Sequence, residues 1–176
     1  MTSHSLIRYT YRKLGANDEA IVWRMLYEAA RLADEGLAST SAAKQNPELV
    51  KYARGWGRAG DLGFAAFEPD SLEPVGASWV RLLTGPDRGY GYLNDSTPEL
   101  AMGVLPEHRN KGVGTKLLGL LLESAGQTHR AICLNVRADS PAVKFYKRWG
   151  FTEVPGSAIT NRVGGCSINM HLMLAK

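Results

Sequence analysis

The 176-residue sequence predicts a single α/β domain built on a mixed, mostly antiparallel β-sheet. Three observations lead to this prediction. Segments with the two-residue period of strands alternate with segments that have the helical period. Two strands joined by a short turn come early in the chain, which indicates antiparallel pairing. A strand, a helix and a further strand follow one another late in the chain, which indicates a parallel crossover.

The first half of the chain contributes a strand, two helices and a hairpin. Asn17 or Asp18 can cap the first helix, and Pro47 suits the start of the second. The turn sequence PDSLEP joins the two hairpin strands. The predicted elements are a strand (6–13), a helix (18–34), a short helix (47–56) and two strands (61–68 and 74–83).

The second half contributes the strands and helices around the predicted crossover. A loop over 84–97, rich in glycine and aspartate, precedes it. Gly150 suits the end of the last helix. The predicted elements are a strand (99–105), a helix (112–127), a short apolar strand (131–136), a helix (142–149) and two strands (151–154 and 167–174). This order differs from that of a doubly wound dinucleotide-binding fold.

Composition narrows the class of protein and its partners. The net charge is +4, from 21 basic and 17 acidic residues, so anionic partners are favoured without one being selected. No stretch has the roughly 18 apolar residues of a membrane span, and the N-terminus has no signal-peptide core. The two cysteines cannot form a disulfide framework or a four-ligand zinc site. We expect a cytoplasmic protein without a metal, a membrane partner or a nucleic-acid partner.

The segment between the strand over 99–105 and the next helix carries the clearest chemical signal. Gly112 and Gly114 let the backbone turn tightly at the helix start, where the first N–H groups have no intrahelical partner. These N–H groups and the helix dipole form an anion site suited to a diphosphate. Arg109, Lys111 and the Thr115 hydroxyl can add donors. Neither the P-loop motif nor the G-x-G-x-x-G motif is present at this turn.

This segment resembles the signature of the Gcn5-related N-acetyltransferase (GNAT) family, [RQ]-x-x-G-x-[GA]. Arg109, Gly112 and Gly114 match it position by position. A second stretch is similar to the family's downstream cofactor motif, N…N-x-x-A-x-x-[FL]-Y-x-x-x-G-F. Its matching segments are Leu134-Asn135-Val136, Asp139-Ser140-Pro141-Ala142 and Phe145-Tyr146-Lys147-Arg148-Trp149-Gly150-Phe151. The likeness is strongest over about 62–154.

The resemblance implies a fold, a cofactor and a set of cofactor-binding residues. One domain over 1–176 would carry helices on both faces of its sheet. The two central parallel strands, over 99–105 and 131–136, would splay apart in a V that holds acetyl-CoA. The diphosphate would lie on the backbone N–H groups of the helix start, and the pantetheine would pair with the first strand of the V. The cofactor-binding residues implied are Met102, Gly103, Val104, Arg109, Asn110, Lys111, Gly112, Val113, Gly114, Thr115, Asn135 and Ser140. Asn135 can equally hold the splay open.

The resemblance also implies two catalytic residues. Tyr146 aligns with the family's catalytic tyrosine and would donate a proton to the departing thiol. Glu99, at the start of the cofactor strand, would accept a proton from the amine. Structural alternatives exist for both residues, since aromatic side chains at helical spacing usually pack and glutamates at strand ends are usually exposed. His171 is an alternative base.

The implied activity is direct transfer of an acetyl group from acetyl-CoA to a primary amine of a small molecule or a protein. The alternative is a non-catalytic acyl-CoA-binding regulatory domain of the same fold. The acceptor would meet the segments over 31–56 and 155–166, whose sequences do not identify it. The family's frequent dimers make a homodimer an expectation.

Overall fold

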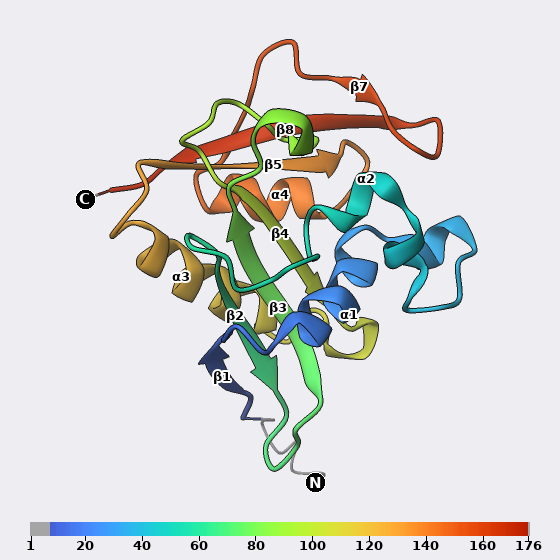
Figure 1. Ribbon diagram of the computed structural model, residues 1–176, viewed down its shortest axis with the longest axis vertical. Coiled ribbons are helices and arrows are strands. Elements are labelled where there is room, and N and C mark those ends of the chain that lie inside the picture. Colours follow the sequence, from blue (N-terminus) through green and yellow to red (C-terminus); the bar gives the residue numbers. More distant parts are fainter. Residues whose placement is uncertain (1–7, 176) are drawn as a thin grey trace, which may run out of the picture.

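A computed structural model describes residues 8–175 and shows one mixed sheet that runs through the whole molecule (Figure 1). Its strands are β1 (Thr10–Lys13), β2 (Leu62–Phe67), β3 (Pro74–Arg81), β4 (Glu99–Val104), β5 (Ala131–Arg137), β6 (Thr152–Glu153), β7 (Ile159–Thr160) and β8 (Cys166–Met173). The order across the sheet is β1-β2-β3-β4-β5-β8-β6, and β7 also pairs with β8. The predicted mixed, mostly antiparallel α/β fold is therefore confirmed.

The centre of the sheet contains a parallel pair that separates. In the described part of the chain β4 and β5 pair in parallel, and the paired position is Glu99 with Cys133. The Cys133 N–H donates to the Pro98 carbonyl there at 3.1 Å. β4 pairs over its whole length with β3, and β5 pairs over its whole length with β8. The sheet therefore opens between β4 and β5 as the two strands leave this point, as the predicted V requires.

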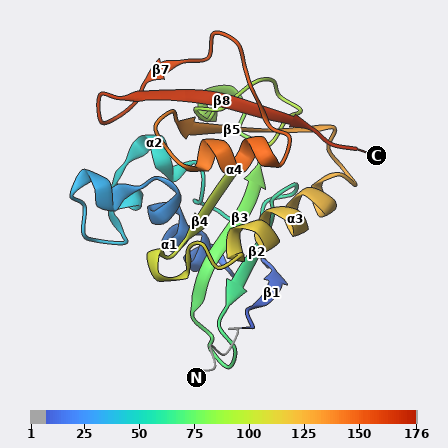
Figure 2. The ribbon, with the colours of Figure 1, turned by 180° about the vertical axis from the view of Figure 1, so that it is seen from behind.

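Helices cover both faces of the sheet. Helices α1 (Glu19–Ala29) and α2 (Pro47–Val50) lie on one face, which is the near side in Figure 1. Helices α3 (Val113–Ala125) and α4 (Ala142–Arg148) lie on the other, seen from behind in Figure 2. Strand alternation sends neighbouring side chains to opposite layers. Leu100 and Leu134 join the α3–α4 layer, whereas Ala101 packs against the α1–α2 layer.

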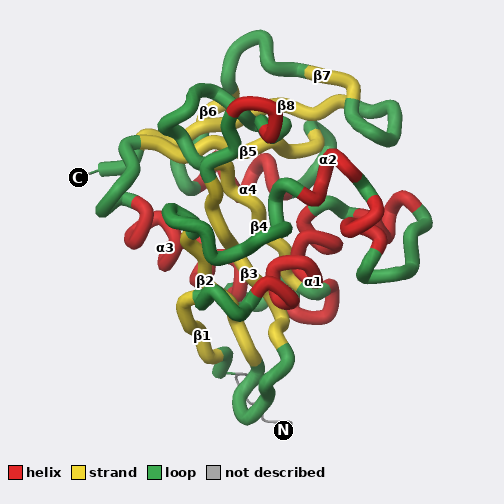
Figure 3. Tube along the Cα trace, viewed as in Figure 1, coloured by secondary structure: helices red, strands yellow, loops and turns green. Residues whose placement is uncertain are grey.

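The strongly periodic elements lie close to their predicted positions. β2, β3, β4, α3, β5, α4 and β8 each overlap the predicted range and differ from it by at most two residues at either end. In the first strand, β1 begins at Thr10, and the predicted residues Leu6 and Ile7 lie outside the described residues. Residues 30–46 form loops with two short 3₁₀ turns, Leu32–Glu35 and Ala42–Gln45 (Figure 3).

Two predicted helix ends are wrong, and one strand was not predicted. The first helix ends at Ala29 instead of Asp34, because Arg31 takes the left-handed conformation (φ 56°, ψ 42°) that an α-helix cannot contain. The second helix ends at Val50 instead of Trp56, and the chain continues in turns. Strand β7 was not predicted, since two residues are too few to show a period. No helix among the described residues is long and apolar enough to cross a membrane.

Candidate active site

The opening between β4 and β5 is a cleft of about 610 Å³. Its walls come from the end of α1, from β4 and β5, from the start of α4, and from the segment around β7. Of the predicted site residues, Glu99, Met102, Gly103, Val104, Arg109, Asn135, Ser140 and Tyr146 line it. The fold thus brings the two predicted catalytic side chains and half of the predicted cofactor-binding residues to one cavity.

Glu99 lines the cleft and is buried, with 3% of its surface exposed. The Tyr52 hydroxyl donates to its Oε1 at 2.7 Å, and the Gly91 N–H donates to the same oxygen at 2.9 Å. The Tyr90 N–H in turn donates to the Tyr52 hydroxyl at 2.8 Å, which orients that hydroxyl toward the carboxylate. Glu99 is therefore a buried carboxylate held by two hydrogen-bond donors, and not the exposed carboxylate of an ordinary strand end.

The second oxygen of this carboxylate is an exception among buried polar atoms. Glu99 Oε2 is buried and has no hydrogen-bond partner among the described residues. The loop over 84–97 covers it so closely that a Cβ on Gly89 would overlap Oε2. Burial raises the pKa of Glu99 from its ordinary value of 4.5 to about 7, against the opposing effects of its hydrogen bonds and of Lys51. A carboxylate with this pKa can take up and release a proton near neutral pH.

Tyr146 lies on α4 with 7% of its surface exposed, and it also lines the cleft. Its ring packs edge-on between Phe145 and Phe151, with 5.4 Å between centroids in both pairs. Burial raises the pKa of Tyr146 above its usual value, so the hydroxyl stays protonated at neutral pH. No hydrogen bond ties this hydroxyl to another described residue, which leaves it free to donate to a molecule in the cleft.

The start of α3 has the backbone form that an anion site needs. Gly112 takes a left-handed conformation (φ 81°), and a Cβ added to it would meet no atom within 4 Å. The first helical hydrogen bond runs from the Lys116 N–H to the Gly112 carbonyl, at 3.1 Å. The N–H groups of Val113, Gly114 and Thr115 precede it and have no intrahelical acceptor. These N–H groups are the donors that the sequence predicts for a diphosphate.

The side chains of this turn divide between core and surface. Val113 is 1% exposed and packs in the core, so that only its backbone can serve a ligand. Asn110 has a left-handed backbone (φ 58°) and, like Lys111 and Thr115, an exposed side chain. A Cβ added to Gly114 would lie 3.9 Å from the side chains of Met102 and Phe145, so no atom crowds this side of the helix start.

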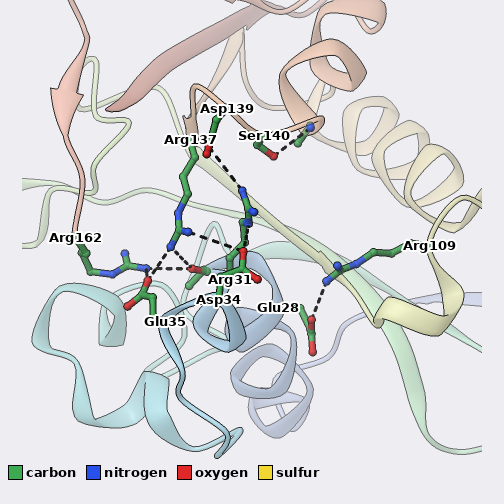
Figure 4. A network of polar contacts seen from close by, with 11 residues as sticks. Glu28, Arg31, Asp34, Glu35, Arg109, Arg137, Asp139, Ser140 and Arg162 are labelled. Atoms are coloured by element: carbon green, nitrogen blue, oxygen red, sulfur yellow. Dashed lines mark hydrogen bonds and ion pairs between the residues drawn. The ribbon is translucent and has the colours of Figure 1, made fainter. Parts of the chain in front are cut away.

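Arg109 lines the cleft and also makes hydrogen bonds within the protein. Its Nε donates to the Val104 carbonyl at 2.9 Å, and its Nη2 donates to Glu28 Oε2 at 2.9 Å. It therefore connects the end of β4 with the end of α1 (Figure 4). Half of its side chain remains exposed, which leaves guanidinium surface available to an anion.

Met102, Gly103 and Val104 form the β4 side of the opening. Each pairs with β3 on one side, opposite Ser78, Ala77 and Gly76 in turn. On the other side β5 has moved away, because the parallel pairing lies at Glu99. Alternate residues of an antiparallel strand turn their backbone groups away from the partner. β4 thus offers backbone donors and acceptors to an extended molecule that lies in the opening.

Asn135 and Ser140 line the cleft but also have structural partners. The Asn135 side-chain amide donates to Asn169 Oδ1 at 2.8 Å, which holds β5 to β8 and agrees with a role in keeping the strands apart. The Ser140 Oγ accepts from the Ala142 N–H at 3.2 Å at the start of α4. Both residues combine a place in the cleft with a role in fixing its walls.

Several other residues have simpler explanations. Cys133 is fully buried, and burial followed by the nearby Glu99 raises the pKa of its thiol, so it is no nucleophile at neutral pH. His171 does not line the cleft, which disfavours it as the base. The described residues contain no group of three or more His, Cys, Asp or Glu that could hold a metal ion.

Sequence reasoning missed two features of the cleft. Tyr52 reaches Glu99 from 47 positions away in the chain, and no motif indicates this contact. Three arginines, Arg31, Arg137 and Arg162, also line the cleft, from three separate segments. The only sequence signal for these residues is that Arg31 and Arg162 lie in the two segments predicted to meet the acceptor.

Comparison with solved structures confirms the fold. Similar chains include yncA of Salmonella typhimurium, solved with its cofactor acetyl-CoA (20% identity, 96% of this chain and 95% of that chain covered, TM-score 0.64). They also include the ribosomal-protein-S18-alanine N-acetyltransferase of Escherichia coli (17%, 96% and 96%, 0.62). A third is a spermidine N-acetyltransferase SpeG chimera from Vibrio cholerae and hSSAT (17%, 94% and 95%, 0.63). At these identities the likeness concerns the fold.

Sequence comparison identifies the family. A search of curated protein sequences finds no match. The model of the acetyltransferase (GNAT) domain matches residues 62–153, which is more than half of the chain. This range begins at β2 and ends at β6, so it includes β4, the start of α3, β5 and α4. Because the matched range contains the cleft and both motifs found in the sequence, the chain belongs to the GNAT acetyltransferase family.

Proposed function

We propose that this protein is an acetyl-CoA-dependent N-acetyltransferase that moves an acetyl group directly from the thioester to a primary amine. The observation that carries the proposal is the buried Glu99, whose pKa of about 7 suits a proton acceptor in the same cleft as the Tyr146 hydroxyl. A domain that only bound acyl-CoA would have no need of this costly carboxylate. The catalytic reading is therefore preferred over the non-catalytic alternative.

The donor follows from the family and from the site. The similar yncA structure holds acetyl-CoA as its cofactor. In this chain the N–H groups that begin α3 would hold the diphosphate, and the free side of β4 would hold the pantetheine. Bound acetyl-CoA supplies a thioester whose carbonyl carbon is attacked by an amine. Side chains of the protein must then remove a proton from the amine and deliver a proton to the departing thiolate.

Glu99 serves as the base. A primary amine with a pKa of ~10 is almost fully protonated at neutral pH and must lose a proton before it can attack. Glu99 lines the cleft and accepts that proton, directly or through a water molecule. The Tyr52 and Gly91 donors hold the carboxylate by its Oε1 while this happens.

Tyr146 serves as the acid that assists departure of the thiol. Burial raises the pKa of Tyr146 and makes it a weaker acid than a tyrosine in water. A thiolate that leaves inside the cleft is poorly solvated as well, so its pKa is raised in the same direction. Burial raises the pKa of a thiol in this protein, as it does for Cys133 beside Glu99. The leaving sulfur therefore becomes more basic in this environment, and the Tyr146 hydroxyl can hydrogen-bond to it and supply a proton.

The test measures thiol release from acetyl-CoA with a panel of primary amines, for the wild type and for Glu99→Gln. Glutamine can still accept the hydrogen bonds from Tyr52 and Gly91, so the site keeps its shape. We expect amine-dependent release by the wild type and a loss of about 10²- to 10⁴-fold in the variant near pH 8. The ratio of the two rates should fall about tenfold per pH unit below pH 7, because Glu99 becomes protonated there.

This ratio cancels the ionisation of the amine itself, which affects both proteins equally. Acetyl-CoA should raise the melting temperature of both proteins, because the variant keeps the start of α3 and the free side of β4. A melting temperature that rises without thiol release for any amine would favour the non-catalytic acyl-CoA-binding domain. A rate ratio independent of pH would exclude Glu99 as the base.

A further inference from the structure

Three arginines from separate parts of the chain converge on the cleft (Figure 4). Arg31 follows α1, Arg137 ends β5, and Arg162 lies between β7 and β8. Their side chains are 37%, 14% and 25% exposed, in that order. Arginine is seldom this buried unless it is paired, so the partners of these guanidinium groups decide what they are for.

Two carboxylates hold the arginines in place from outside the cleft lining. Arg137 Nη2 and Arg162 Nη2 both donate to the same Glu35 oxygen at 2.8 Å, and Arg31 Nε donates to Asp34 at 2.7 Å. Asp34 and Glu35 do not line the cleft, whereas all three arginines do. The carboxylates thus lie behind the guanidinium groups and leave the cationic edges facing the cavity.

The guanidinium groups keep donors that the protein does not use. Each has five N–H donors. Arg137 and Arg162 both bond the Ala30 carbonyl as well as Glu35, and Arg137 is the more engaged of the two because its Nη1 also lies 4.0 Å from Asp34. Arg162 makes its bonds to Glu35 and the Ala30 carbonyl through Nη2. The residues with most spare capacity are therefore Arg31 and Arg162.

Arg31 has two further features that point to a ligand. Its Nη1 is buried without a hydrogen-bond partner among the described residues, and the nearest charge is Asp139 at 3.9 Å, on a side chain that is 84% exposed. Its backbone is left-handed, a strained conformation for arginine that persists only where the surroundings enforce it. A buried donor without a partner requires an explanation, and a ligand that accepts its hydrogen bond would supply one.

The arginines lie on the side of the sheet where an acceptor can reach Glu99. Along β5, Cys133 and Arg137 share one face by alternation, and Cys133 is the partner of Glu99. Apolar side chains line the cleft on the same side, among them Leu26, Leu49 and Tyr90. This part of the cleft therefore combines a proton acceptor, an apolar wall and a cluster of guanidinium groups.

We propose that the acceptor is a small amine that carries its own carboxylate, as an apolar amino acid does, and that Arg31 and Arg162 bind that carboxylate. The planar forks of these guanidinium groups match the two oxygens of a carboxylate. Arg137 acts as a positioning residue that fixes Glu35 and the chain at Ala30. The inference rests on the proposed function and adds the class of its acceptor.

The same charges disfavour a polycationic acceptor. Within the cleft lining the acidic side chains are Glu99, which faces the amine, and Glu28, which is paired with Arg109 at 2.9 Å. A second ammonium group would face guanidinium groups instead of carboxylates. Like charges at short range in a partly buried site are repulsive and favour rejection of such a substrate.

The test compares L-leucine with isopentylamine, which is the same molecule without its carboxylate. With acetyl-CoA in excess, we expect kcat/KM for leucine to exceed that for isopentylamine by at least about tenfold, the size expected for charge-assisted hydrogen bonds. Spermidine should be the poorest of these substrates. Leucine should also bind the protein saturated with coenzyme A in a calorimeter, a measurement that does not depend on turnover.

Variants assign the effect to the arginines. Arg162→Gln removes one guanidinium, and Arg31→Asn removes another with a residue that tolerates the left-handed backbone. Each should raise KM for leucine by about ten- to hundredfold and change KM for isopentylamine much less, so the preference for the acid collapses. The matched control is Arg12→Gln, which removes an equally close arginine pair, with Asp18 at 2.7 Å, on β1. An intact rise in melting temperature with acetyl-CoA shows that each variant is folded.

The outcomes separate this inference from the function on which it rests. If no amine releases thiol, the proposed function fails and this inference fails with it. If amines react but isopentylamine, spermidine or a C-terminally amidated peptide with N-terminal leucine is preferred to leucine, only the acceptor class is wrong. Should Arg162→Gln fail to fold, Arg31→Asn and the calorimetric titration of the wild type decide the question. An unchanged leucine preference in Arg31→Asn would overturn the assignment of this residue.

Discussion

At the scale of single residues, the same neighbours that make Glu99 costly also make it useful. Taking a carboxylate out of water disfavours its charge, and only Tyr52, Gly91 and the charge of Lys51 oppose that effect. The balance leaves a pKa of about 7, where a glutamate in water would be fully ionised. Sequence alone could name this residue but could not give its pKa, which depends on the distant Lys51 and Tyr52 and on how the loop before β4 folds over it.

Tyr146 can be tested without disturbing the core. Tyr146→Phe keeps the ring contacts with Phe145 and Phe151 and removes only the hydroxyl. We expect kcat to fall by about ten- to hundredfold, at the low end of acid catalysis because a thiol is a good leaving group. The dissociation constant of acetyl-CoA and the melting temperature should stay close to those of the wild type. Stopped-flow thiol release measures kcat, and thermal melts with increasing acetyl-CoA measure the melting temperature and the affinity for the cofactor.

A matched control uses another tyrosine outside the cleft. The Tyr92 hydroxyl donates to Asp95 at 2.7 Å, and Tyr92 does not line the cleft, so Tyr92→Phe should turn over like the wild type. If Tyr146→Phe is as active as Tyr92→Phe at every pH, Tyr146 serves only to pack α4 against the sheet.

At the scale of elements, the loop over 84–97 is as important to the site as the strands. It closes over Glu99 because Gly89 has no side chain: a Cβ there would overlap Glu99 Oε2 and lie 2.7 Å from the Tyr52 hydroxyl. In Gly89→Ala the loop has to move outward and let water reach the carboxylate. The pKa of Glu99 should then fall toward 4.5, and the acid side of the pH–rate profile should move down with it.

The profile of kcat/KM against pH between 5 and 9 measures this shift. Asp87→Ala is the control, since it changes an exposed residue of the same loop. An acid limb that stays near pH 7 in Gly89→Ala would mean that the loop does not set the pKa of Glu99.

The elements predicted correctly are those whose pattern is long and local. α3 and β8 each show a clear period, and the turn at Gly112 follows from a motif within a few residues. The end of α1 was missed because Leu32 continues the apolar spacing beyond Ala29. The left-handed Arg31 stops the helix, and its side chain is held by a hydrogen bond to Asp34 that no sequence pattern shows. Tyr52, Arg31 and Arg162 belong to the site through contacts between distant segments, which no periodicity records. The cytoplasmic location and a homodimer stay predictions.

At the scale of the whole molecule, β4 and β5 lack most of their mutual hydrogen bonds, and the opening this leaves can hold a ligand. β4 and β5 would bury each other if they paired along their length, and they separate after Glu99 instead. Side chains hold the walls instead: Arg109 with Glu28 joins the end of β4 to α1, and Arg137 with Glu35 joins the end of β5 to the segment after α1. These ion pairs offset part of the stability that is lost where β4 and β5 do not pair. The burial of the Glu99 carboxyl lowers the stability further at neutral pH.

That last cost should be visible as a pH dependence of global stability. The pKa of Glu99 is raised from 4.5 in the unfolded chain to about 7 in the folded protein, so the folded state binds this proton more tightly. Its contribution to the free energy of unfolding is greatest below about pH 4.5, falls as the pH rises toward 7, and is constant above 7. The full change is about 3 kcal/mol, since one pKa unit corresponds to about 1.4 kcal/mol.

Glu99→Gln cannot ionise, so it should lack this dependence while all other titrating groups remain. We therefore expect the free energy of unfolding of the wild type, relative to the variant, to drop by about 2–3 kcal/mol between pH 5 and pH 8. Urea denaturation at several pH values measures it, with Glu48→Gln, at an exposed position of α2, as a control for loss of a carboxylate. Parallel curves for the wild type and Glu99→Gln would show that Glu99 has an ordinary pKa in the folded protein, and the proton acceptor proposed for the reaction would have to be sought elsewhere in the cleft.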